Sequence, residues 1–482
     1  FAWPMKSLLL LAALSLSAAS LCAKGHEHIH VFRNDNKFNT YKAAEVTDLS
    51  FANQLMMVTT GKGRTTYPMS VIDSCVLRTT GIPEIHVNLI DYPDWTELQG
   101  AKDDVRAARL YMDGNGMYDD LEEQEIEFRG RGNSTWRMDK KPYRFKMAKK
   151  KSVCGLPKAK TFALLANNID CTLMRNAIAL WLARYFEMPY TNHAVPVKVY
   201  LNGIDKGQYV MTEKIGIGGG SVDIDETTGM LFELDTNYDE AYKFRYSWSG
   251  KNIPVMVKDP DLDELAADPE VTTITDAKAY LAQWQADFTK MANAVTTRKA
   301  SQSLADVLDI KSAVNYFLVN CLCGNHEVHH PKSVYMHKKS LADGELYHMG
   351  PVWDFDWAFT FDGKEGAPAN TPLIETDGKA NGYSFFKLIL ANQEFKALFK
   401  AKFEAFVKDG YPELKAFIAE YANLIEPSAK ENGLLWPSRR DSASKYRVVG
   451  SFDFRTNLAT LEKWIDQRID YMKSDANYGL YR

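Results

Sequence analysis

Two aspartates lie inside an otherwise aromatic and aliphatic stretch, Pro351-Val-Trp-Asp-Phe-Asp-Trp357. Burying an ionised carboxylate in such surroundings is costly unless a cation or dense hydrogen bonding compensates for it. In an extended segment, Asp354 and Asp356 would point to the same face because side chains alternate along a strand. Hard oxygen ligands favour Mg²⁺, Mn²⁺ or Ca²⁺ over zinc. The stretch therefore predicts a divalent metal site at Asp354 and Asp356, with a salt-bridged loop packed by tryptophans as the alternative.

The residues before these aspartates predict a β-hairpin. Residues 333–339 and 345–350 have the composition of strands, and Ala342-Asp343-Gly344 between them is typical of a tight turn. A hairpin brings its two ends together, so segment 324–332 is expected close to the aspartates. The predicted site then gathers His326, Glu327, His329, His330 and Lys332 around Asp354 and Asp356.

The overall composition is that of a globular protein. The chain has 482 residues, of which 45% are hydrophobic and 25% charged, and this length allows about two or three domains. The net charge of -4 provides no global positive field that would attract nucleic acid. We therefore expect no nucleic-acid partner.

Residues 5–23 predict a secretory signal peptide. Lys6 gives a positive start, residues 8–16 form an apolar core, and small residues precede a cleavage site. A lipoprotein anchored at Cys22 is the alternative, although Leu21 is a poor residue before a lipidated cysteine. No later stretch has about 18 consecutive apolar residues, so we expect no transmembrane span in the mature chain. The protein is expected to be exported to the periplasm, the cell surface or the medium.

The order of the remaining elements predicts an α+β fold. Short β-like runs in residues 24–80 indicate a small β-rich module, and longer strands are predicted at 84–90, 107–112, 122–129, 160–165, 195–201, 207–214, 230–235 and 253–258. Helices are then predicted at 276–297, 310–323, 385–392, 394–408, 411–425 and 454–473. Strands first and helices later indicate two lobes, and the aspartates fall where the lobes should meet, a usual place for a ligand site.

Two further segments carry polar residues in suggestive patterns. Arg129-Gly-Arg-Gly-Asn-Ser-Thr-Trp136 is a glycine-punctuated turn, and a strand follows it with Arg144 and Lys146 on one face. Backbone N–H groups and cations in this arrangement predict a phosphate cradle, with a basic strand on a solvated face as the alternative. The amphipathic segment 172–186 predicts a helix capped by Asp170 or Thr172. Arg175 and Asn176 in its first turns are expected to face a polar pocket or to cap another segment.

Several of these segments, in this order, resemble the CotH family of atypical protein kinases, named for a spore coat protein H. The resemblance rests on the turn at 129–136, Lys140-Lys-Pro-Tyr-Arg-Phe-Lys146, the 167–176 segment, residues 209–215, and Trp353-Asp-Phe-Asp356, and it covers about residues 82–475. It implies a degenerate two-lobed protein-kinase-like fold. It also implies binding of ATP with Mg²⁺ or Mn²⁺, and phosphorylation of serine or threonine on an exported protein substrate.

The resemblance further implies roles for individual residues. Residues 129–135 would replace the glycine-rich loop of kinases, Lys146 would be the phosphate-pairing lysine, and residues 209–215 would border the adenine. Asp354, with Asp356 nearby, would hold the metal. The candidate nucleotide-binding residues are Arg131, Asn133, Arg144, Lys146, Arg175 and Glu213.

The expected catalytic residues depart from the usual kinase pattern. Kinases have an aspartate followed five residues later by an asparagine that binds a second metal, and the corresponding residues here are Glu327 and Lys332. Glu327 can still accept a proton, whereas Lys332 cannot ligate a metal and would instead neutralise a transferring phosphoryl group. Two alternatives follow: a kinase-like scaffold that binds or adheres without catalysis, and a metal-dependent hydrolase that uses His326, His329 or His330 with Asp354.

Overall fold

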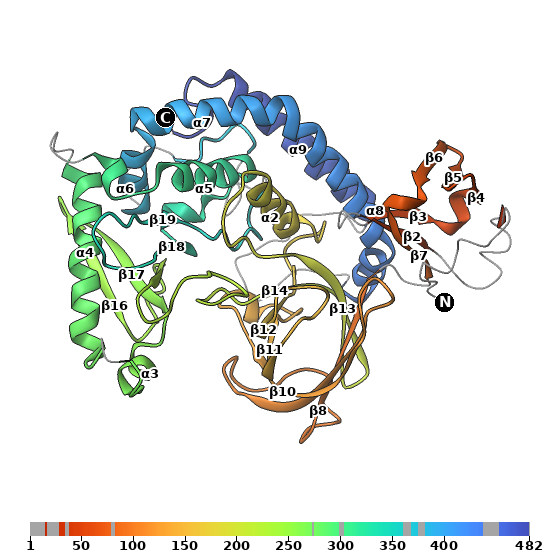
Figure 1. Cartoon of the computed structure of the whole chain (residues 1–482), viewed down its shortest axis with the longest axis horizontal. Helices are drawn as coiled ribbons and strands as arrows, with labels where there is room; N and C mark the ends of the chain where they lie inside the picture. The colour runs from red at the N-terminus through yellow and green to blue at the C-terminus, as the bar shows by residue number, and fades with distance from the viewer. Residues whose placement is uncertain are drawn as a thin grey trace.

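The computed structural model describes residues 15–16, 28–33, 38–78, 82–271, 274–297, 303–359, 368–374, 381–436 and 453–481. The fold is α+β, as predicted, with separate strand-rich regions and a group of helices (Figure 1). Apart from the short strand β1 (Ser15–Leu16), the predicted signal segment 5–23 lies outside the described residues.

The N-terminal strands form two small antiparallel sheets. One sheet has the order β3-β2-β7 and the other β1-β4-β5-β6. Apolar residues between them, among them Ile29, Val31 and Val58, are fully buried and form a core separate from the rest of the chain. The strands are β2 (His28–Arg33), β3 (Phe38–Lys42), β4 (Val46–Ala52), β5 (Leu55–Thr60), β6 (Gly63–Pro68) and β7 (Ile72–Arg78).

The next seven strands close into a barrel of order β10-β11-β12-β14-β13-β8-β9. Alternation of buried and exposed residues builds it: Ala108, Leu110 and Met112 of β9 point inward, and their neighbours point outward. The predicted strands of this region are present, but the closure, made by parallel pairing of β8 with β13, was not predicted. The strands are β8 (Glu84–Leu89), β9 (Arg106–Asp113), β10 (Leu121–Gly130), β11 (Tyr143–Lys151), β12 (Ala159–Leu165), β13 (Val195–Leu201) and β14 (Ile204–Glu213).

A second sheet follows the barrel and has the order β16-β17-β15-β18-β19. The predicted hairpin is confirmed within it, since Met336 of β18 lies opposite Met349 of β19. Gly344 in the connecting turn has a φ of 86°, which a glycine adopts without strain. The sheet consists of β15 (Met230–Leu234), β16 (Lys243–Trp248), β17 (Lys251–Asp259), β18 (Val334–Lys338) and β19 (His348–Met349).

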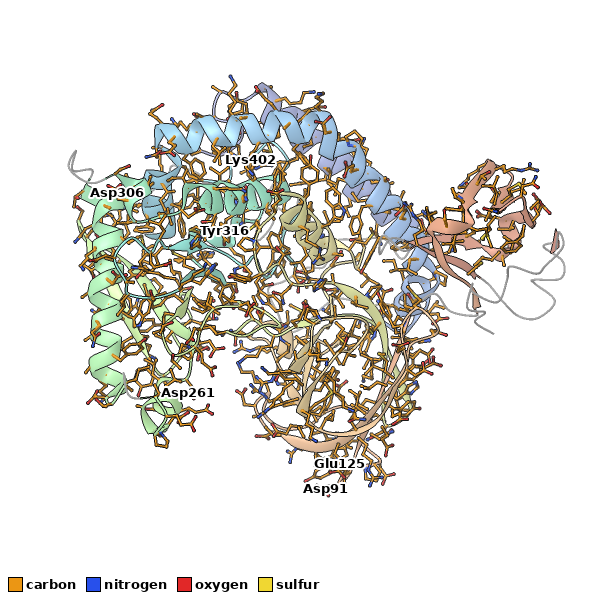
Figure 2. All side chains as sticks on the ribbon, in the orientation of Figure 1. Asp91, Glu125, Asp261, Asp306, Tyr316 and Lys402 are labelled. Carbon is orange, nitrogen blue, oxygen red and sulfur yellow. The ribbon has the colours of Figure 1, made fainter. Side chains whose placement is uncertain are left out.

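Helices cover this sheet and span the top of the molecule in Figure 1. Almost every residue of α5 is buried, so this helix runs through the centre of the largest hydrophobic core. Figure 2 shows the contrast between Tyr316 of α5, deep in the fold, and Asp91, Glu125 and Asp261 at its periphery. The helices are α2 (Arg175–Tyr185), α3 (Leu262–Ala267), α4 (Ala277–Thr297), α5 (Ile310–Cys323), α6 (Asn381–Leu390), α7 (Gln393–Ala405), α8 (Tyr411–Leu435) and α9 (Phe454–Ser474).

Several predicted helix boundaries were wrong, among them the start of α6, which lies at Asn381 rather than at residue 385, and two others have a clear physical reason. Helix α8 does not stop at Ile425 but continues through Pro427, because buried residues after the proline pack on the barrel and the Ser428 hydroxyl bonds the carbonyl of Ile425 at 2.9 Å. Helix α2 begins three residues later than expected, at Arg175, because Leu173 adopts a left-handed φ of 58°.

None of the helices in the described ranges is both long and apolar enough to cross a lipid bilayer.

Candidate functional site

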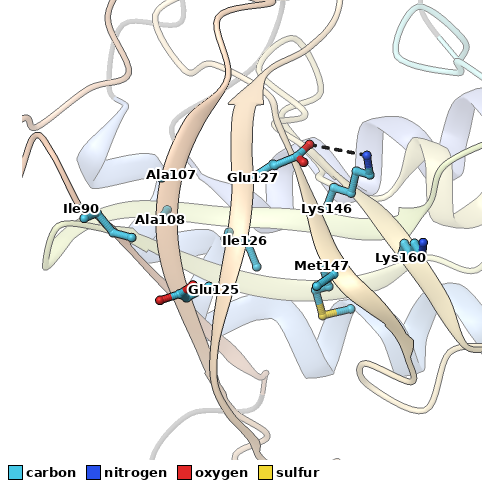
Figure 3. Close-up of a pocket in the computed structure, with 10 residues that line it drawn as sticks. Ile90, Ala107, Ala108, Glu125, Ile126, Glu127, Lys146, Met147 and Lys160 are labelled. Carbon is cyan, nitrogen blue, oxygen red and sulfur yellow. Dashed lines mark ion pairs between the residues drawn. The ribbon is translucent and has the colours of Figure 1, made fainter.

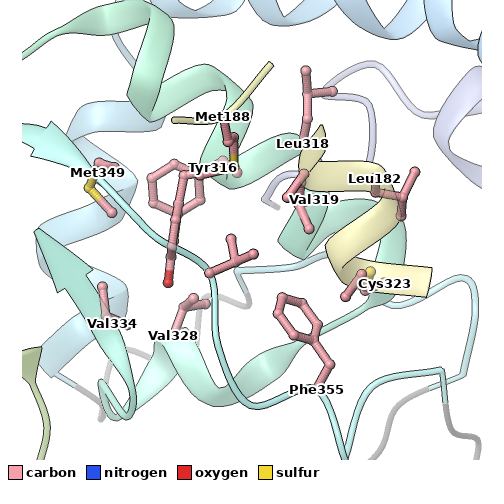
Figure 4. Close-up of a cluster of buried hydrophobic side chains, with 14 of the residues drawn as sticks. Leu182, Met188, Tyr316, Leu318, Val319, Cys323, Val328, Val334, Met349 and Phe355 are labelled. Carbon is pink, nitrogen blue, oxygen red and sulfur yellow. The ribbon is translucent and has the colours of Figure 1, made fainter. Parts of the chain in front are cut away.

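Two hydrophobic side chains anchor the segments that carry the predicted carboxylates. Phe355, between the two aspartates, and Val328, next to Glu327, are each 1% exposed. Both belong to the same buried cluster, which also contains Tyr316 (Figure 4). Because the neighbours of these anchors lie on the rim of the cluster, Asp354, Asp356 and Glu327 stay partly accessible.

The aspartate segment is not extended, so that part of the sequence interpretation was wrong. Asp354 has a φ of 64°, in the left-handed region that few residues other than glycine occupy, although aspartate tolerates it better than most. The chain turns tightly there, and the backbone N–H of Asp356 donates to the Asp354 carboxylate. The two carboxylates are therefore neighbours across a turn rather than members of one strand face.

Side chains at the start of helix α2 hold the aspartate turn in place by hydrogen bonds. Asn176 donates to the Asp356 carboxylate through Nδ2 at 2.6 Å and accepts the backbone N–H of Phe355 at 3.0 Å. Arg175 donates through Nη1 to the backbone carbonyl of Asp356 at 2.6 Å. Asp170 in turn accepts the backbone N–H of Arg175 at 2.9 Å. The expectation that Arg175 and Asn176 face polar groups is thus confirmed.

Glu327 reaches the same place from the end of α5. Gly324 ends that helix with a φ of 59°, and a Cβ there would come within 2.8 Å of Trp464. The next residue, Asn325, links the two segments: its Oδ1 accepts the backbone N–H of Glu327 and its Nδ2 donates to the carbonyl of Asp354, each at 3.4 Å. The predicted meeting of the 324–332 segment with the aspartates is confirmed.

The three carboxylates share a strongly desolvated environment. Burial raises the pKa of Glu327 well above its usual range, and the neighbouring Asp354 raises it further. Burial also raises the pKa of Asp356 to about 7, again with a contribution from Asp354. For Asp354, burial raises the pKa while Arg131 opposes the shift. Like charges held close together in low dielectric resist ionising together, and a bound cation would relieve this.

Two further cations, besides Arg175, act on these carboxylates. Arg131 follows β10 and lies against Trp353, with its guanidinium carbon 5.5 Å from the ring centre. Burial lowers the pKa of Arg131, and Asp354 and Asp356 counteract that effect. Lys332 is the main positive charge acting on Glu327. Neither cation comes within 4.0 Å of a carboxylate oxygen of any residue that the structure describes.

Sequence reasoning missed two acidic residues at this site. Asp235, just after β15, is 4% exposed and accepts the backbone N–H of Asn237 at 2.7 Å and of Ser333 at 3.2 Å. Glu233 is 6% exposed and forms an ion pair with Lys258 at 2.8 Å. Their signal in the sequence is a pair of acids at alternate positions in an apolar strand. Only the pairing of β15 with β18 shows that these two acids lie near the predicted site.

A family model described as CotH kinase protein matches residues 126–472. The chain belongs to the CotH kinase family. A search of curated proteins finds no match. The matched range begins inside β10 and ends inside α9, so it includes Arg131 and all the carboxylates described above. It leaves out β8 and β9, which nonetheless complete the barrel of this family member.

The barrel places Lys146 away from the aspartate turn. Its ammonium lies on the outer face of β11, 3.7 Å from the carboxylate of Glu127 on β10. Both side chains line a groove of about 360 Å³ with Glu125 and Lys160 (Figure 3). The charges that act most strongly on Asp354 and Asp356 include Arg131 and Arg175 but not Lys146.

Three other candidate nucleotide ligands that the sequence predicted lie in different surroundings. Asn133 is exposed and accepts a hydrogen bond from Lys102 at 2.8 Å. Glu213 is 2% exposed, and its carboxylate lies 2.5 Å from Nδ1 of His193. Arg144 is half-buried, and burial lowers its pKa, with Arg129 and Arg131 among the nearby charges. Of these, Arg144 is electrostatically linked to the site through Arg131.

The histidines that the structure describes are not grouped as a zinc site. His329 hydrogen-bonds the carbonyl of Leu373 through Nε2 and stacks on Tyr383 at 3.8 Å. Within the described ranges, no group of three or more histidine, cysteine, aspartate or glutamate side chains is placed to hold a metal. This gives the hydrolase alternative no support. It is compatible with magnesium in a kinase, because Mg²⁺ usually binds one or two carboxylates and takes its other ligands from phosphates and water.

Proposed function

We propose that the chain is a phosphotransferase that uses ATP and Mg²⁺ or Mn²⁺ to phosphorylate serine or threonine of exported or cell-surface proteins. In this proposal, residues 82–475 form a two-lobed kinase-like domain, with the barrel as the first lobe and the second sheet with its helices as the other. Residues 24–80 are a separate β-rich module ahead of it. The observation that carries the proposal is the placement of Arg131, Glu327 and Lys332 around the Asp354–Asp356 turn.

The residues of the site divide the work according to their chemistry. Asp354 is the principal metal ligand, as the metal-binding aspartate is in other kinases, and Asp356, one of whose oxygens accepts the Asn176 amide, lies beside it. The bound nucleotide would supply the phosphoryl group. Arg131 and Lys332 carry positive charge with no direct carboxylate partner among the described residues, so they are available to phosphate oxygens.

Glu327 is placed to handle the hydroxyl proton of the acceptor. A pKa raised by burial makes its carboxylate a stronger base than an exposed glutamate, and a stronger base accepts the hydroxyl proton more readily. The loop at 325–332 holds it beside the metal turn through Asn325. Glu327 therefore takes the role that an aspartate has in other kinases.

The proposal is tested with the purified chain, ATP labelled at the γ-phosphate, Mg²⁺ or Mn²⁺, and a mixture of exported proteins. We expect labelled phosphoserine or phosphothreonine in the mixture, and none with Asp354→Asn. Absence of both transfer and nucleotide binding with either metal would refute the proposal.

A non-catalytic binding or adhesion protein is the second candidate, because Glu327 and Lys332 replace the usual aspartate and asparagine. For such a protein, neither wild type nor Glu327→Gln would transfer phosphate from ATP with any metal, and both would bind the same partner.

A further inference from the structure

The loop that carries Lys332 is fixed on both sides by backbone hydrogen bonds. The N–H of Lys332 itself donates to the carbonyl of Glu327 at 2.9 Å. On one side, the carbonyl of Pro331 accepts the N–H of Thr236 at 3.0 Å. On the other, the N–H of Ser333 donates to the Asp235 carboxylate at 3.2 Å. The backbone of Lys332 therefore cannot move away from the site without breaking bonds to the end of β15.

The charge of Lys332 acts on three carboxylates, yet its ammonium forms no direct ion pair with a carboxylate of the described residues. Its charge acts on Glu327, Asp354 and Asp235. No described carboxylate oxygen lies within 4.0 Å of its ammonium. A half-buried ammonium that is directly paired with none of these three acids can still form an ion pair with a further anionic group.

Another lysine of the same sheet shows how a structural lysine differs. Lys338, at the end of β18, is 5% exposed and its ammonium lies 2.7 Å from the carboxylate of Asp287. It also lies over the ring of Tyr347, 5.1 Å from the centre. Lys338 thus has a direct ion pair within the fold, whereas Lys332 has none with the described residues.

The position of Lys332 matters for metal binding. In protein kinases, the residue five positions after the catalytic-loop acid is an asparagine whose oxygen binds the second magnesium ion. A protonated lysine has no lone pair to offer a metal, and its charge repels a second cation. Asp354 and Asp356, on the other side of Glu327, still provide ligands for one ion.

We infer that the ammonium of Lys332, held in place by Asp235 and Glu327, takes the place of the second metal ion, so that the nucleotide binds with one divalent ion per chain. This inference rests on the proposed function. Lys332 would contact the phosphate oxygens that the second ion contacts in other kinases. Asp235 would act as a positioning residue for the lysine loop.

The stoichiometry can be measured without catalysis. Equilibrium dialysis of the full chain with Mn²⁺ and the β,γ-imido analogue of ATP gives the number of Mn²⁺ ions held per bound nucleotide. We expect one ion in the wild type, one in the exposed-lysine control Lys339→Asn, and two in Lys332→Asn. We also expect Lys332→Met to keep one ion but to bind the analogue about 10-fold more weakly, because a charged hydrogen bond is lost.

Each outcome decides a different statement. Two ions in the wild type would overturn the inference and leave the proposed function intact. One ion in Lys332→Asn, or unchanged nucleotide affinity in Lys332→Met, would show that the lysine neither excludes the second ion nor replaces it. Failure of the wild type to bind the analogue at any Mn²⁺ concentration would refute the proposed function and this inference together. Circular dichroism of every variant establishes that it is folded.

Discussion

Glu426 and the half-buried carboxylates of the aspartate turn all face positive charges, but of these, in the part of the chain that the structure describes, only Glu426 is in direct contact with them. Glu426 of α8 is 3% exposed, yet Lys42 and Lys430 lie 2.9 and 3.0 Å from its oxygens and Arg455 is also in contact. At the aspartate turn, Arg131 and Lys332 influence the carboxylates through space without a direct ion pair among the described residues.

As a consequence, the pKa of Glu426 is lowered, whereas the pKa of Asp356 is raised. Burial raises the pKa of Glu426, but hydrogen bonds from Arg455, Lys42 and Lys430 overcome this and hold it at about 2. Burial raises the pKa of Asp356 to about 7, and the nearby Asp354 adds to the effect. A carboxylate with all its partners within the chain contributes to stability. The carboxylates of the aspartate turn have hydrogen bonds but no direct ion pair with Arg131 or Lys332, so their crowding destabilises the free protein and a bound cation would relieve it.

The largest expected effect is that of Asp354→Asn. Losing the principal metal ligand should lower phosphoryl transfer by about 1000-fold, the scale seen when an electrostatic stabiliser of a transition state is removed. Unfolding in urea should show the free protein no less stable than the wild type, because one of several crowded carboxylates is gone. Asp343→Asn, in the exposed hairpin turn, is the matched control and should change neither quantity. Equal metal-dependent ATP affinity in wild type and Asp354→Asn would contradict the assignment.

Glu327→Gln should have the next largest effect. Removing a positioned general base lowers transfer by roughly 100-fold or more, while ATP and metal binding stay intact. Single-turnover kinetics and calorimetry on the same samples separate the two. Glu327→Asp should retain more activity than Glu327→Gln because it keeps a carboxylate. Transfer that is unaffected by Glu327→Gln would mean that the reaction relies on positioning and metal electrostatics alone.

The sequence predicted those parts of the molecule whose structure depends on residues close together in the chain. Alternation in β9 and the turn at Gly344 define strands and a hairpin locally, and the hairpin alone places Glu327 near Asp354. Barrel closure could not be predicted in the same way, because it requires β8 to pair in parallel with β13, more than a hundred residues further along the chain.

The site was predictable to the same extent. Glu327, Lys332, Asp354 and Asp356 flank one hairpin, so their meeting follows from local structure. The contribution of Asp235 depends on β15 lying beside β18, which no local pattern specifies. The left-handed turn at Asp354 is also invisible in sequence, because the packing of Phe355 and the bonds from Asn176 impose it.

A pair of variants compares two candidate phosphate ligands. Arg131→Met should weaken ATP binding by about 10- to 100-fold, because a charge-assisted hydrogen bond in the site is lost. The resemblance to kinases predicts the same for Lys146→Met, although this lysine is paired with Glu127 on the outer barrel face. Calorimetric titration with ATP and Mg²⁺ decides between them. A larger loss in Lys146→Met than in Arg131→Met would move the nucleotide to the groove in Figure 3.

The smallest expected effect is that of changing Glu426, the carboxylate that pairs directly with three cations. Glu426→Gln should lower the free energy of unfolding by about 1–3 kcal/mol at pH 7, because three charged hydrogen bonds lose their acceptor charge, and it should leave ATP binding unchanged. The folded-state pKa of Glu426 is about 2, below its ordinary 4.5. The stability that it provides is therefore complete above about pH 4.5 and is lost as the pH falls through 2.

Urea unfolding of wild type and Glu426→Gln at several pH values between 7 and 3 should accordingly show a stability difference that narrows toward acid. Glu413→Gln, an exposed change on the same helix, should remain within about 0.5 kcal/mol of the wild type at every pH. A stability difference for Glu426→Gln that does not change with pH would show that its three cations do not lower its pKa. Direct pairing with cations would then not explain why the carboxylates of Glu426 and of the aspartate turn differ in pKa.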